Sequence, residues 1–352
     1  MGGKIGMKIR IEDKLIGEEE PCFIIAEAGV NHNGSVELAK KLIDAAKDAG
    51  ADAVKFQTFK AEEIVTLRSK KAGYQNRAKE KTQYDMLSAL ELSFDEFQEL
   101  KKYCDNKGIE FISTPYDIKS VEFLNQLGVN RFKVASADLI NRPLIEAIAK
   151  TKKQIILSTG MATLGEIERT ISLINDFGNK DIILLHCTAG YPTPYDQVNM
   201  NVLHTLKKAF GLAVGYSDHT LGIEIPIMAV SMGAKVIEKH FTLDRRMEGP
   251  DHFVSLEPNE FKKMIDAIRN VEKAFGDGKK QITNEEKKNI FFMRRSIHAS
   301  KDMEQGERIK ENNIKITRPF DGIEPWFLDI ILGKKIKVKL KKDDPIKWED
   351  LL

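Results

Sequence analysis

The sequence predicts a closed (β/α)₈ barrel followed by a small β-rich C-terminal module. From residue 23 onward, short apolar runs alternate with amphipathic stretches eight times within roughly 250 residues, as in a barrel of parallel strands and helices. After residue 275 this pattern stops, and a polar, glycine-bearing stretch precedes shorter β-type runs. The 352 residues are too many for one ordinary small domain but suit a barrel with an appendage.

Eight apolar runs are the predicted barrel strands. Each is rich in Val, Ile or Phe and bounded by Gly, Pro, Ser or Thr, as expected of strands buried on both faces. They are Phe23–Gly29, Ala53–Thr58, Glu110–Pro115, Arg131–Ser136, Gln154–Gly160, Asp181–Ala189, Leu212–Ser217 and Ala234–Thr242. Between them lie helical patterns such as Val36–Gly50, which ends in a glycine. A doubly wound open sheet is the alternative, but no GxGxxG turn follows the first run, and we favour the barrel.

The chain is expected to divide into four parts. They are a hairpin that closes the bottom of the barrel (1–22), the barrel (23–275), a linker (276–289) and the β-rich module (290–352). Gly17 is expected in a turn of the hairpin, and Pro258–Phe275 is expected to be the last barrel helix. The module has three β-type runs, Ser296–Ala299, Ile314–Thr317 and Ile336–Leu340. Because about sixty residues make a small core, the module should dock on the barrel or on a partner chain.

Composition excludes several classes of protein. With 55 Lys and Arg against 53 Asp and Glu, the net charge of +2 implies no large polycationic surface for nucleic acid. Three widely spaced cysteines without a CxxC pair argue against a disulfide framework or a zinc knot, and favour a reducing compartment. No apolar run is long enough to span a membrane, and residues 1–20 lack the apolar run of a signal peptide. We therefore expect a cytoplasmic protein that binds neither nucleic acid nor membrane.

Polar or ionisable residues end nearly every predicted strand, where barrel enzymes hold their chemistry. They are Glu27, Lys55, Gln57, Thr114, Lys133, Ser136, Asp138, Ser158, Thr159, His186, Thr188, Ser217, Asp218, His219, Glu238, Lys239 and His240. A single one would often only cap a strand or satisfy a loop. Their recurrence on all eight strands indicates a functional site.

Two lysines dominate the charge of this end of the barrel. Lys55 and Lys133 lie inside apolar runs, where an unpaired ammonium is costly to bury. They predict an anion site, which hydroxyl groups from Ser136, Ser158 and Ser217 would complete for a phosphate or carboxylate. A buried ion pair, such as Lys55 with Glu27, and a Schiff-base lysine are the two alternatives. Two lysines together favour the anion site.

Two histidines end the last two strands, which are neighbours in a closed barrel. His219 and His240 could therefore reach one metal ion and leave positions open for water and substrate. Carboxylates at the same end favour Mn²⁺ or Mg²⁺ over structural zinc. His186 and His204 lack such a partner and are interpreted as structural, whereas His32 either touches substrate or orders its turn.

Eight motifs in order resemble the sialic acid synthase family, which includes legionaminic and pseudaminic acid synthases. They are IAEAGVNHNG (Ile25–Gly34), VKFQTF (Val54–Phe59), FISTP (Phe111–Pro115), ILSTGM (Ile156–Met161), HCTAGYPTP (His186–Pro194), GYSDHTLG (Gly215–Gly222), EKHFTLD (Glu238–Asp244) and GPDH (Gly249–His252). The segments RRSIHASKDMEQGE (Arg294–Glu307) and ITRPFDGIE (Ile316–Glu324) resemble the family's antifreeze-like (SAF) domain. The resemblance covers almost the whole chain and implies a TIM barrel with a SAF domain.

The resemblance implies a transferase that condenses phosphoenolpyruvate with an open-chain N-acetylated aminosugar, N-acetylmannosamine or a related sugar. The products are a nine-carbon nonulosonic acid and phosphate. The alternative is a legionaminic or pseudaminic acid synthase that uses a 2,4-diacetamido-2,4,6-trideoxyhexose.

The resemblance also implies a role for each residue of the site. Glu27 would orient or deprotonate a water, Asp138 would stabilise a cation or hold sugar hydroxyls, and a metal on His219 and His240 would polarise the aldehyde. Mn²⁺ is the expected metal, with Mg²⁺ or Co²⁺ as the other choices. Arg318 would reach the active site of the other subunit, which implies a domain-swapped homodimer. The expected substrate-binding residues are Lys55, Gln57, Thr114, Lys133, Ser136, Ser158, Tyr191, Ser217, Asp251 and Arg318.

The chain departs from the family pattern at two positions, and two rival functions need consideration. Some members have Glu where Asp138 stands, and some have Asn where this chain has Ala189 and Gly190. The loop over residues 69–92 looks closer to that of legionaminic acid synthases. A Schiff-base lyase would need a lysine on the sixth strand, and none lies there. Ice binding needs a weakly polar face, but the tail is rich in Lys, Asp and Glu.

Overall fold

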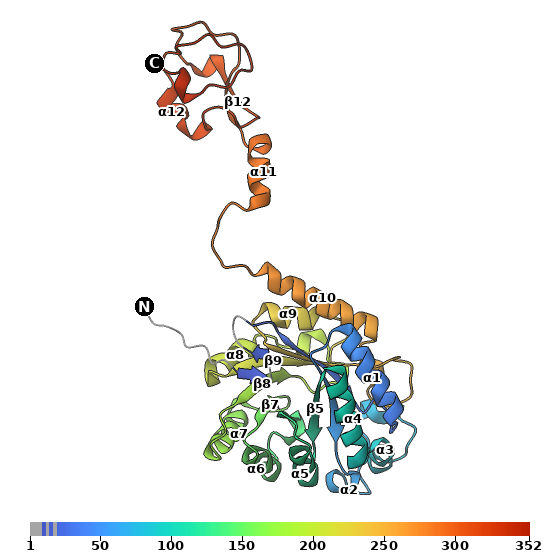
Figure 1. Cartoon of the computed structure of the whole chain (residues 1–352). Coiled ribbons are helices and arrows are strands. Elements are labelled where there is room, and N and C mark those ends of the chain that lie inside the picture. Colours follow the sequence, from blue (N-terminus) through green and yellow to red (C-terminus); the bar gives the residue numbers. More distant parts are fainter. Residues whose placement is uncertain (1–8, 12–13, 17–19) are drawn as a thin grey trace. The chain divides into compact units, whose positions relative to one another are not determined.

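The computed structural model describes residues 9–11, 14–16 and 20–352. The chain forms two compact units, Met1–Phe275 and Gly276–Leu352 (Figure 1). The first unit holds the barrel and the second holds the module at the C-terminal end of the chain.

Eight parallel strands form the predicted (β/α)₈ barrel. They are β3 (Phe23–Gly29), β4 (Ala53–Thr58), β5 (Glu110–Pro115), β6 (Arg131–Val134), β7 (Gln154–Ser158), β8 (Ile182–Cys187), β9 (Ala213–Asp218) and β10 (Val236–His240). The order is β5-β4-β3-β10-β9-β8-β7-β6, and the end strands β5 and β6 are in contact. The first three strands have the predicted bounds, and the others differ at one or both ends by one or two residues. The fold-class prediction is confirmed.

Helices follow the strands on the outside of the barrel. They are α1 (Val36–Ala49), α4 (Phe94–Lys107), α5 (Ile118–Gln126), α6 (Arg142–Lys150), α7 (Leu164–Asp176), α8 (Val202–Phe210), α9 (Glu224–Ser231) and α10 (Pro258–Ala274). Sequence signals mark their ends: the Ser35 hydroxyl accepts a hydrogen bond from the Leu38 N–H, and Gly50 ends α1 with a φ of +92°. Two further helices, α2 (Ala61–Ile64) and α3 (Gln83–Leu90), lie in the long connection between β4 and α4.

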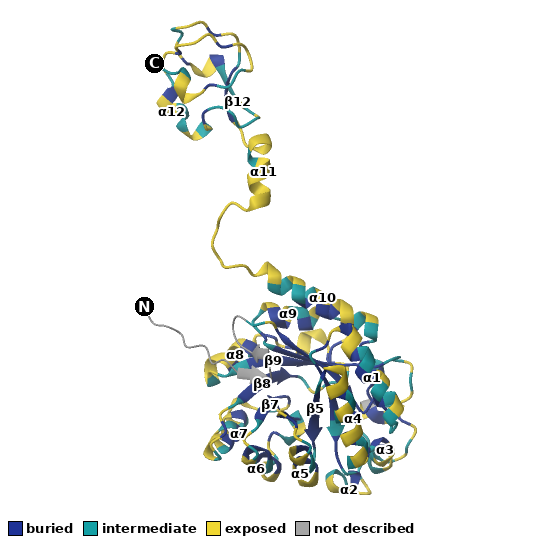
Figure 2. Cartoon of the chain, in the orientation of Figure 1, coloured by how far each residue is buried: buried dark blue, intermediate teal, exposed yellow. Residues whose placement is uncertain are grey.

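The barrel is filled by apolar side chains at one end and by polar ones at the other. The strands are buried and the outer helices expose one face (Figure 2). An inner cluster fills the lower part of the barrel; it comprises Phe23, Ile25, Ala53, Ile112, Ile156, Ile183, Leu185 and Val236. Packing there is tight: a Cβ added at Gly215 would lie 2.4 Å from the Val236 carbonyl oxygen. A cavity opens at the other end of the barrel, where the strands have their carboxyl ends.

The second unit is built from short elements around a small core. Helix α11 (Asn284–Met293) precedes the antiparallel strands β11 (Ser296–Ala299) and β12 (Ile314–Thr317), and α12 (Leu328–Ile331) follows. Nine buried apolar side chains form the core of this unit: Ile297, Ala299, Met303, Ile309, Ile323, Ile331, Ile336, Leu340 and Ile346.

Two expectations about the tail need correction. The run Ile336–Leu340 is not a strand, because only its end residues make isolated bridges, Ile336 to Leu351 and Leu340 to Met303. The later part of the expected linker (276–289) is helical, since α11 begins at Asn284 behind a Thr283–Glu286 capping box.

The N-terminal segment contains an antiparallel pair, β1 (Ile9–Ile11) and β2 (Lys14–Ile16), as expected of a hairpin. Gly17, where a turn was expected, lies outside the described residues, and closure of the barrel by this segment stays a prediction.

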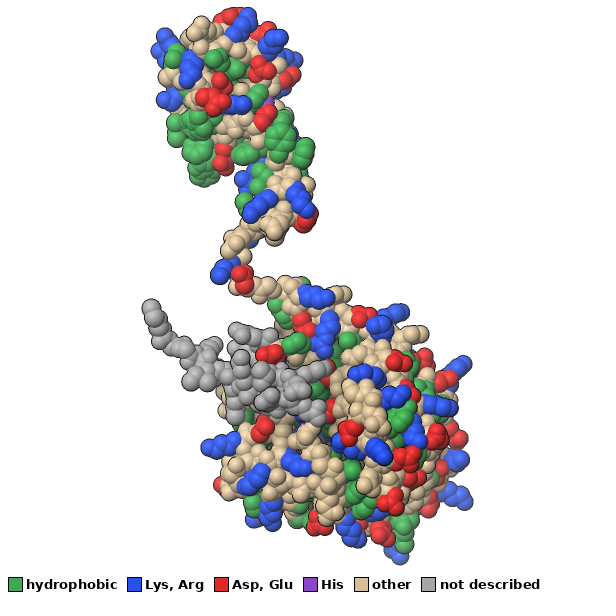
Figure 3. All heavy atoms as spheres, in the orientation of Figure 1, with side chains coloured by type: hydrophobic (Ala, Val, Ile, Leu, Met, Phe, Trp, Pro, Cys, Tyr) green, Lys and Arg blue, Asp and Glu red, His purple; other side chains and the backbone are tan. Residues whose placement is uncertain are grey.

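Lysines, arginines and acidic residues are interspersed on the visible face of the barrel (Figure 3). Among the described residues, no helix is long and apolar enough to cross a membrane.

Candidate active site

One cavity of about 630 Å³ opens at the carboxyl ends of the barrel strands. The residues to which the sequence analysis gives a catalytic, substrate-binding or metal-binding role line it, with the exception of Arg318. The lining includes Glu27, Lys55, Gln57, Thr114, Lys133, Ser136, Asp138, Ser158, Tyr191, Ser217, His219, His240 and Asp251. The structure therefore brings together side chains from all eight strands, as barrel geometry predicts.

Strand register sets the neighbours at the bottom of the cavity. Glu27 pairs with His240 on one side and with Lys55 on the other. A bulge between Glu27 and Gly29 follows, with Gly29 at a φ of +52°. Gln57 Nε2 donates a hydrogen bond to Glu27 Oε1 at 3.3 Å. A Cβ added at Gly29 would lie 3.3 Å from both of these atoms, so the glycine leaves room for this hydrogen bond.

Two lysines and two glutamates form a buried charged cluster at this point. Lys55 Nζ lies 2.8 Å from Glu27 Oε2 and 3.8 Å from Glu238 Oε2, and it donates to Thr114 Oγ1 at 3.0 Å. Lys133 Nζ lies 3.4 Å from Glu238 Oε1. The Lys55–Glu27 ion pair left open by the sequence is present, and both lysines also face the cavity. The cluster has nearly balanced charge and remains open to a ligand.

Burial and mutual attraction set the protonation of this cluster. Burial raises the pKa of Glu27 to about 7, although Lys55 opposes the shift. Burial would also raise the pKa of Glu238, but Lys133 and Lys55 outweigh it and lower that pKa. Burial lowers the pKa of Lys133, whereas the two carboxylates overcome burial and raise the pKa of Lys55. Glu27 is thus poised to exchange a proton near neutral pH, and Glu238 stays ionised.

Hydroxyl groups surround the lysines. Ser217 donates to Glu238 Oε1 at 3.0 Å, and Ser136 Oγ accepts from the Gly160 N–H at 3.0 Å. Ser158 Oγ is buried without a hydrogen-bond partner. Since buried hydroxyls normally have partners, Ser158 is suited to a ligand oxygen. These groups and the two ammonium groups form a pocket for an anion.

His219, His240 and Tyr191 form an aromatic group beside the charged cluster. The two imidazole centroids are 5.4 Å apart, and the Tyr191 ring lies 4.2 Å from that of His219. His219 Nδ1 lies 2.8 Å from the Thr188 carbonyl oxygen, an arrangement that leaves Nε2 for a ligand. His240 Nδ1 is buried without a hydrogen-bond partner, and burial together with His219 keeps the pKa of His240 well below its ordinary value.

This donor set suits a divalent cation that keeps open coordination positions. Both imidazoles face the same cavity as Asp251, whose pKa burial raises to about 6. Within the part of the chain that the structure describes, no group of three His, Cys, Asp or Glu side chains lies close enough to hold a metal. A cation on His219 and His240 would therefore take its other ligands from water or substrate.

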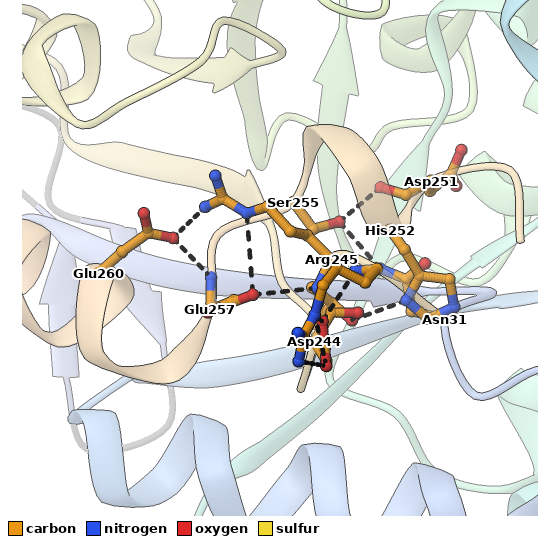
Figure 4. Close-up of polar contacts among 10 residues, drawn as sticks. Asn31, Asp244, Arg245, Asp251, His252, Ser255, Glu257 and Glu260 are labelled. Atoms are coloured by element: carbon orange, nitrogen blue, oxygen red, sulfur yellow. Dashed lines mark hydrogen bonds and ion pairs between the residues drawn. The ribbon is translucent and has the colours of Figure 1, made fainter. Parts of the chain in front are cut away.

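A hydrogen-bonded loop after β10 holds Asp251 at the cavity (Figure 4). The Ser255 hydroxyl donates to the Asp251 carbonyl oxygen at 2.7 Å, and Asn31 donates to Ser255 Oγ at 2.9 Å. His252 bonds to Thr242 Oγ1 at 2.7 Å and to Asn33 at 3.1 Å. The motifs around Asn31 and His252 thus join two loops, and Asp251 keeps its carboxyl group for the cavity.

Asp138 and Asn141 follow β6 in the chain, and both line the cavity. Asp138 ends a short 3₁₀ turn (Ser136–Asp138) and accepts a hydrogen bond from Asn141 Nδ2 at 3.0 Å. Burial raises the pKa of Asp138 above its ordinary value. Asn141 also lines the cavity and was not singled out in the sequence, because it lies three residues beyond the strand end.

Several strand-end residues serve the scaffold. Lys239 pairs with Asp218 beneath the cavity, and His186 Nε2 bonds to the Val198 carbonyl oxygen at 2.7 Å. His32 Nδ1 accepts from the Gly34 N–H at 3.1 Å, which orders its turn. Arg318 lies in the second unit, where its Nε donates to the Met293 carbonyl oxygen at 2.8 Å.

Sequence reasoning missed one half of the cavity. Apolar side chains from the β4–α4 connection and its surroundings line it: Val30, Phe59, Ile64, Val65, Met86, Leu87, Leu90 and Tyr116. We call this set the apolar wall. The sequence offered two signals for this wall: the loop over residues 69–92, which looks closer to that of legionaminic acid synthases, and the short helix α3, whose pattern resembles that of any surface helix. Cys187 also lines the cavity, with its Sγ 3.8 Å from His219 Nδ1.

Comparison with known proteins identifies relatives of both units. Residues 42–280 match the model described as the NeuB family, and residues 294–352 match the SAF domain. An N,N'-diacetyllegionaminic acid synthase of Campylobacter jejuni is 48% identical over 329 residues, which cover 92% of this chain and 98% of the relative. The human N-acetylneuraminate-9-phosphate synthase is 35% identical over 340 residues, which cover 96% of this chain and 94% of the relative. The crystal structure of an N-acetylneuraminic acid synthetase from Leptospira borgpetersenii, in complex with citrate, superposes with a TM-score of 0.73 at 37% identity, covering 81% of this chain and 95% of that one.

Proposed function

This chain belongs to the NeuB family, and we propose that it condenses phosphoenolpyruvate with an open-chain N-acylated aminosugar. The products are a nine-carbon nonulosonic acid and phosphate, and the enzyme is a carbon–carbon bond-forming transferase. One observation carries the proposal: a buried cluster of Lys55, Lys133, Glu27 and Glu238 faces a cavity with unpartnered polar groups.

The charged cluster is suited to phosphoenolpyruvate. This substrate carries a phosphate and a carboxylate, and the two ammonium groups of Lys55 and Lys133 can share them with the hydroxyl groups of Ser136 and Ser158. Charge-assisted hydrogen bonds are strong in a buried site, because water competes poorly there. Glu27 and Glu238 balance the lysines in the free enzyme, which keeps the buried charges paired.

The chain's residues then divide the steps of the reaction. The methylene carbon of phosphoenolpyruvate attacks the aldehyde carbon of the sugar, and the C=O π bond breaks as the new carbon–carbon bond forms. The aldehyde oxygen takes up a proton and becomes a hydroxyl group, while the former enol carbon becomes a cationic centre that still carries the phosphate. Asp138 is suited to stabilising this cation or holding sugar hydroxyls. Glu27 takes a proton from the water that attacks the cation, and loss of phosphate leaves the keto acid. A pKa near 7 suits Glu27 as a base at neutral pH.

We propose that His219 and His240 hold a divalent metal, with Mn²⁺ as the first choice and Mg²⁺ or Co²⁺ as the others. When bound, it would act as a Lewis acid on the sugar aldehyde. The low pKa of His240 supports this proposal, since a neutral imidazole is the form that binds a metal. At His219, Cys187 and the Thr188 carbonyl outweigh burial and raise the pKa to about 8, so a metal would have to displace a proton there.

The acceptor sugar is N-acetylmannosamine or a related N-acylated aminosugar. The second candidate is a 2,4-diacetamido-2,4,6-trideoxyhexose, as in legionaminic or pseudaminic acid synthesis. Identity favours this candidate, because the chain is 48% identical to the C. jejuni N,N'-diacetyllegionaminic acid synthase and 35% identical to the human synthase.

We further propose a domain-swapped homodimer in the cytoplasm. The resemblance to the family implies that Arg318 serves the barrel of a partner subunit, and its side chain is exposed in the second unit, where a partner can reach it. Cys22, Cys104 and Cys187 are all free, which supports a reducing compartment.

A phosphate-release assay tests the function. The enzyme with Mn²⁺ and phosphoenolpyruvate should release phosphate only when an N-acylated aminosugar is added, and mass spectrometry should find the nine-carbon product. Lys55→Ala, made at the charged cluster, should slow the reaction, while the exposed Lys102→Ala serves as its matched control. No phosphate release with any acylated aminosugar would contradict the proposal.

A further inference from the structure

The cavity has two chemically different halves. The charged cluster, the serines and the histidines lie at the strand ends, and the apolar wall faces them from α2, α3 and neighbouring segments. In the apolar wall, Val30, Phe59, Met86 and Leu90 belong to one buried cluster together with Ala78. This half contains few groups that could pair with a sugar hydroxyl.

The apolar wall is held in place by several hydrogen bonds. Glu91, which follows α3, accepts from Lys60 Nζ at 2.7 Å and from the Ala61 N–H at the start of α2 at 2.9 Å. Asp117 accepts from the Lys60 N–H at 3.0 Å, which ties the same point to the loop after β5. Thr82 caps α3 by accepting from the Asp85 N–H at 3.1 Å. These hydrogen bonds fix α2 and α3 relative to each other, so the side chains of the apolar wall have defined positions when a ligand binds.

The apolar wall has an amide edge. Gln75 and Gln83 also line the cavity, and Gln83 Nε2 donates to Gln75 Oε1 at 3.3 Å. Gln75 Oε1 accepts from the Ala72 N–H at 2.9 Å as well, so its side chain is oriented. Amide side chains both donate and accept hydrogen bonds, which suits an acylamino group on a ligand.

We propose that the apolar wall selects the acceptor sugar by the end that lies away from its aldehyde. This inference rests on the proposed function, because the aldehyde must meet phosphoenolpyruvate at the charged cluster, and the far end must then extend toward α2 and α3. A methyl group and an acylamino group at that end would contact the apolar wall and its amide edge. A hydroxymethyl group in place of the methyl group would lie against apolar side chains, and its hydroxyl would lose hydrogen bonds to water there.

The expected selectivity is moderate. An apolar pocket rejects an added hydroxyl group by about 100-fold at most, because the pocket offers no strong repulsion. We therefore expect kcat/KM to be ~10–100-fold higher for a 2,4-diacetamido-2,4,6-trideoxyhexose than for N-acetylmannosamine. The KM for phosphoenolpyruvate should be similar with both acceptors.

The test compares these two acceptors in a phosphate-release assay with wild-type enzyme and with Leu87→Gln. Leu87 lies half-buried in the apolar wall, so an amide of similar size can replace it without opening the core. The variant should lower the kcat/KM ratio between the two sugars by about tenfold. Leu67→Gln is the matched control, because Leu67 lies in the same connection, is 71% exposed and does not line the cavity. Thermal melting would show that both variants fold, and Ile64→Thr provides a second variant at the wall.

Two results overturn different statements. Equal efficiency with the two acceptors, or a ratio that Leu87→Gln and Ile64→Thr leave unchanged in folded protein, would overturn the inference while leaving the synthase function intact. Phosphate release with neither acceptor would overturn the proposed function itself.

Discussion

The barrel and the second unit differ in the charged side chains that they bury and the aromatic side chains that they expose. In the barrel, Lys55 and Lys133 are only 3% exposed and lie among buried carboxylates and hydroxyls. In the second unit, Arg318 is exposed, and Trp326 and Phe292 are 85% and 66% exposed. Figure 3 shows hydrophobic side chains gathered on the visible face of that unit.

This difference indicates that the reaction takes place in the barrel. Burying charges is costly, and in the barrel Lys55 and Lys133 are buried at the place where they also face the cavity. Large exposed apolar side chains, by contrast, are typical of surfaces that meet another protein. The barrel therefore has the features of a reaction site, and the second unit has those of a surface for contact.

Metal removal should have the largest effect, and it should act on the barrel alone. EDTA should abolish phosphate release, and Mn²⁺ or another divalent ion should restore it, because the aldehyde would lose its Lewis acid. His219→Ala and His240→Ala should each lose most turnover while circular dichroism stays that of the wild type. Full activity of either variant without added metal would contradict the metal site.

Glu27→Gln should come next, because it removes the proposed base without changing the size of the side chain. General bases contribute roughly 10²–10⁴-fold to rate, and kcat should fall by that factor. The sign of the pH dependence follows from the raised pKa of about 7: below this pH Glu27 of the free enzyme gains a proton, so wild-type kcat/KM should decline as pH falls through 7. Initial rates from pH 5 to 9 measure this decline at acidic pH, and the decline should be absent in Glu27→Gln. A variant that keeps both the rate and this decline would exclude Glu27 as the base.

The lysines should have smaller effects that appear in binding. Lys55→Ala and Lys133→Ala should each raise the KM for phosphoenolpyruvate by ~10–100-fold, because each loses a charged hydrogen bond worth about 1.5–3 kcal/mol. Lys239→Ala is not a suitable control, since Lys239 is buried against Asp218. The exposed Lys102→Ala should leave KM unchanged. Normal KM values in both cavity variants would mean that these lysines do not hold phosphoenolpyruvate.

The same contrast explains how far sequence reasoning reached. Strands such as β3 and β5 were predicted to the residue, because turn residues bound short runs of buried β-branched and aromatic side chains. Their polar ends were then expected to converge, since barrel geometry gathers them whatever the loops do. Whether Lys55 would pair with Glu27 was undecided, because that depends on the register and the bulge between Glu27 and Gly29.

Where no such geometry applies, the sequence was less informative. The apolar wall lies in a long connection whose side chains have no fixed relation to the strand ends, so Met86 and Leu90 looked like ordinary core residues of a short helix. In the second unit, the run Ile336–Leu340 has β-type composition, yet it forms no strand and pairs with its neighbours only through isolated bridges at its two end residues. Short elements in small cores take their shape from tertiary packing more than from local preference.

Arg318 provides the last and smallest test, because it asks whether the second unit contributes to catalysis at all. Arg318 precedes Pro319 after β12, and a guanidinium can hold a carbonyl or a carboxylate from a fixed direction. If it serves the partner's barrel, His219→Ala chains mixed with Arg318→Ala chains form dimers in which one cavity has both defects and the other has neither. Subunit exchange should then restore activity to at most about half of the sites in each mixed dimer, measured as phosphate release. Each homodimer alone is the control. A mixture that exchanges subunits, verified by mass spectrometry, yet stays inactive would show that Arg318 does not act across the dimer and that each second unit serves its own barrel.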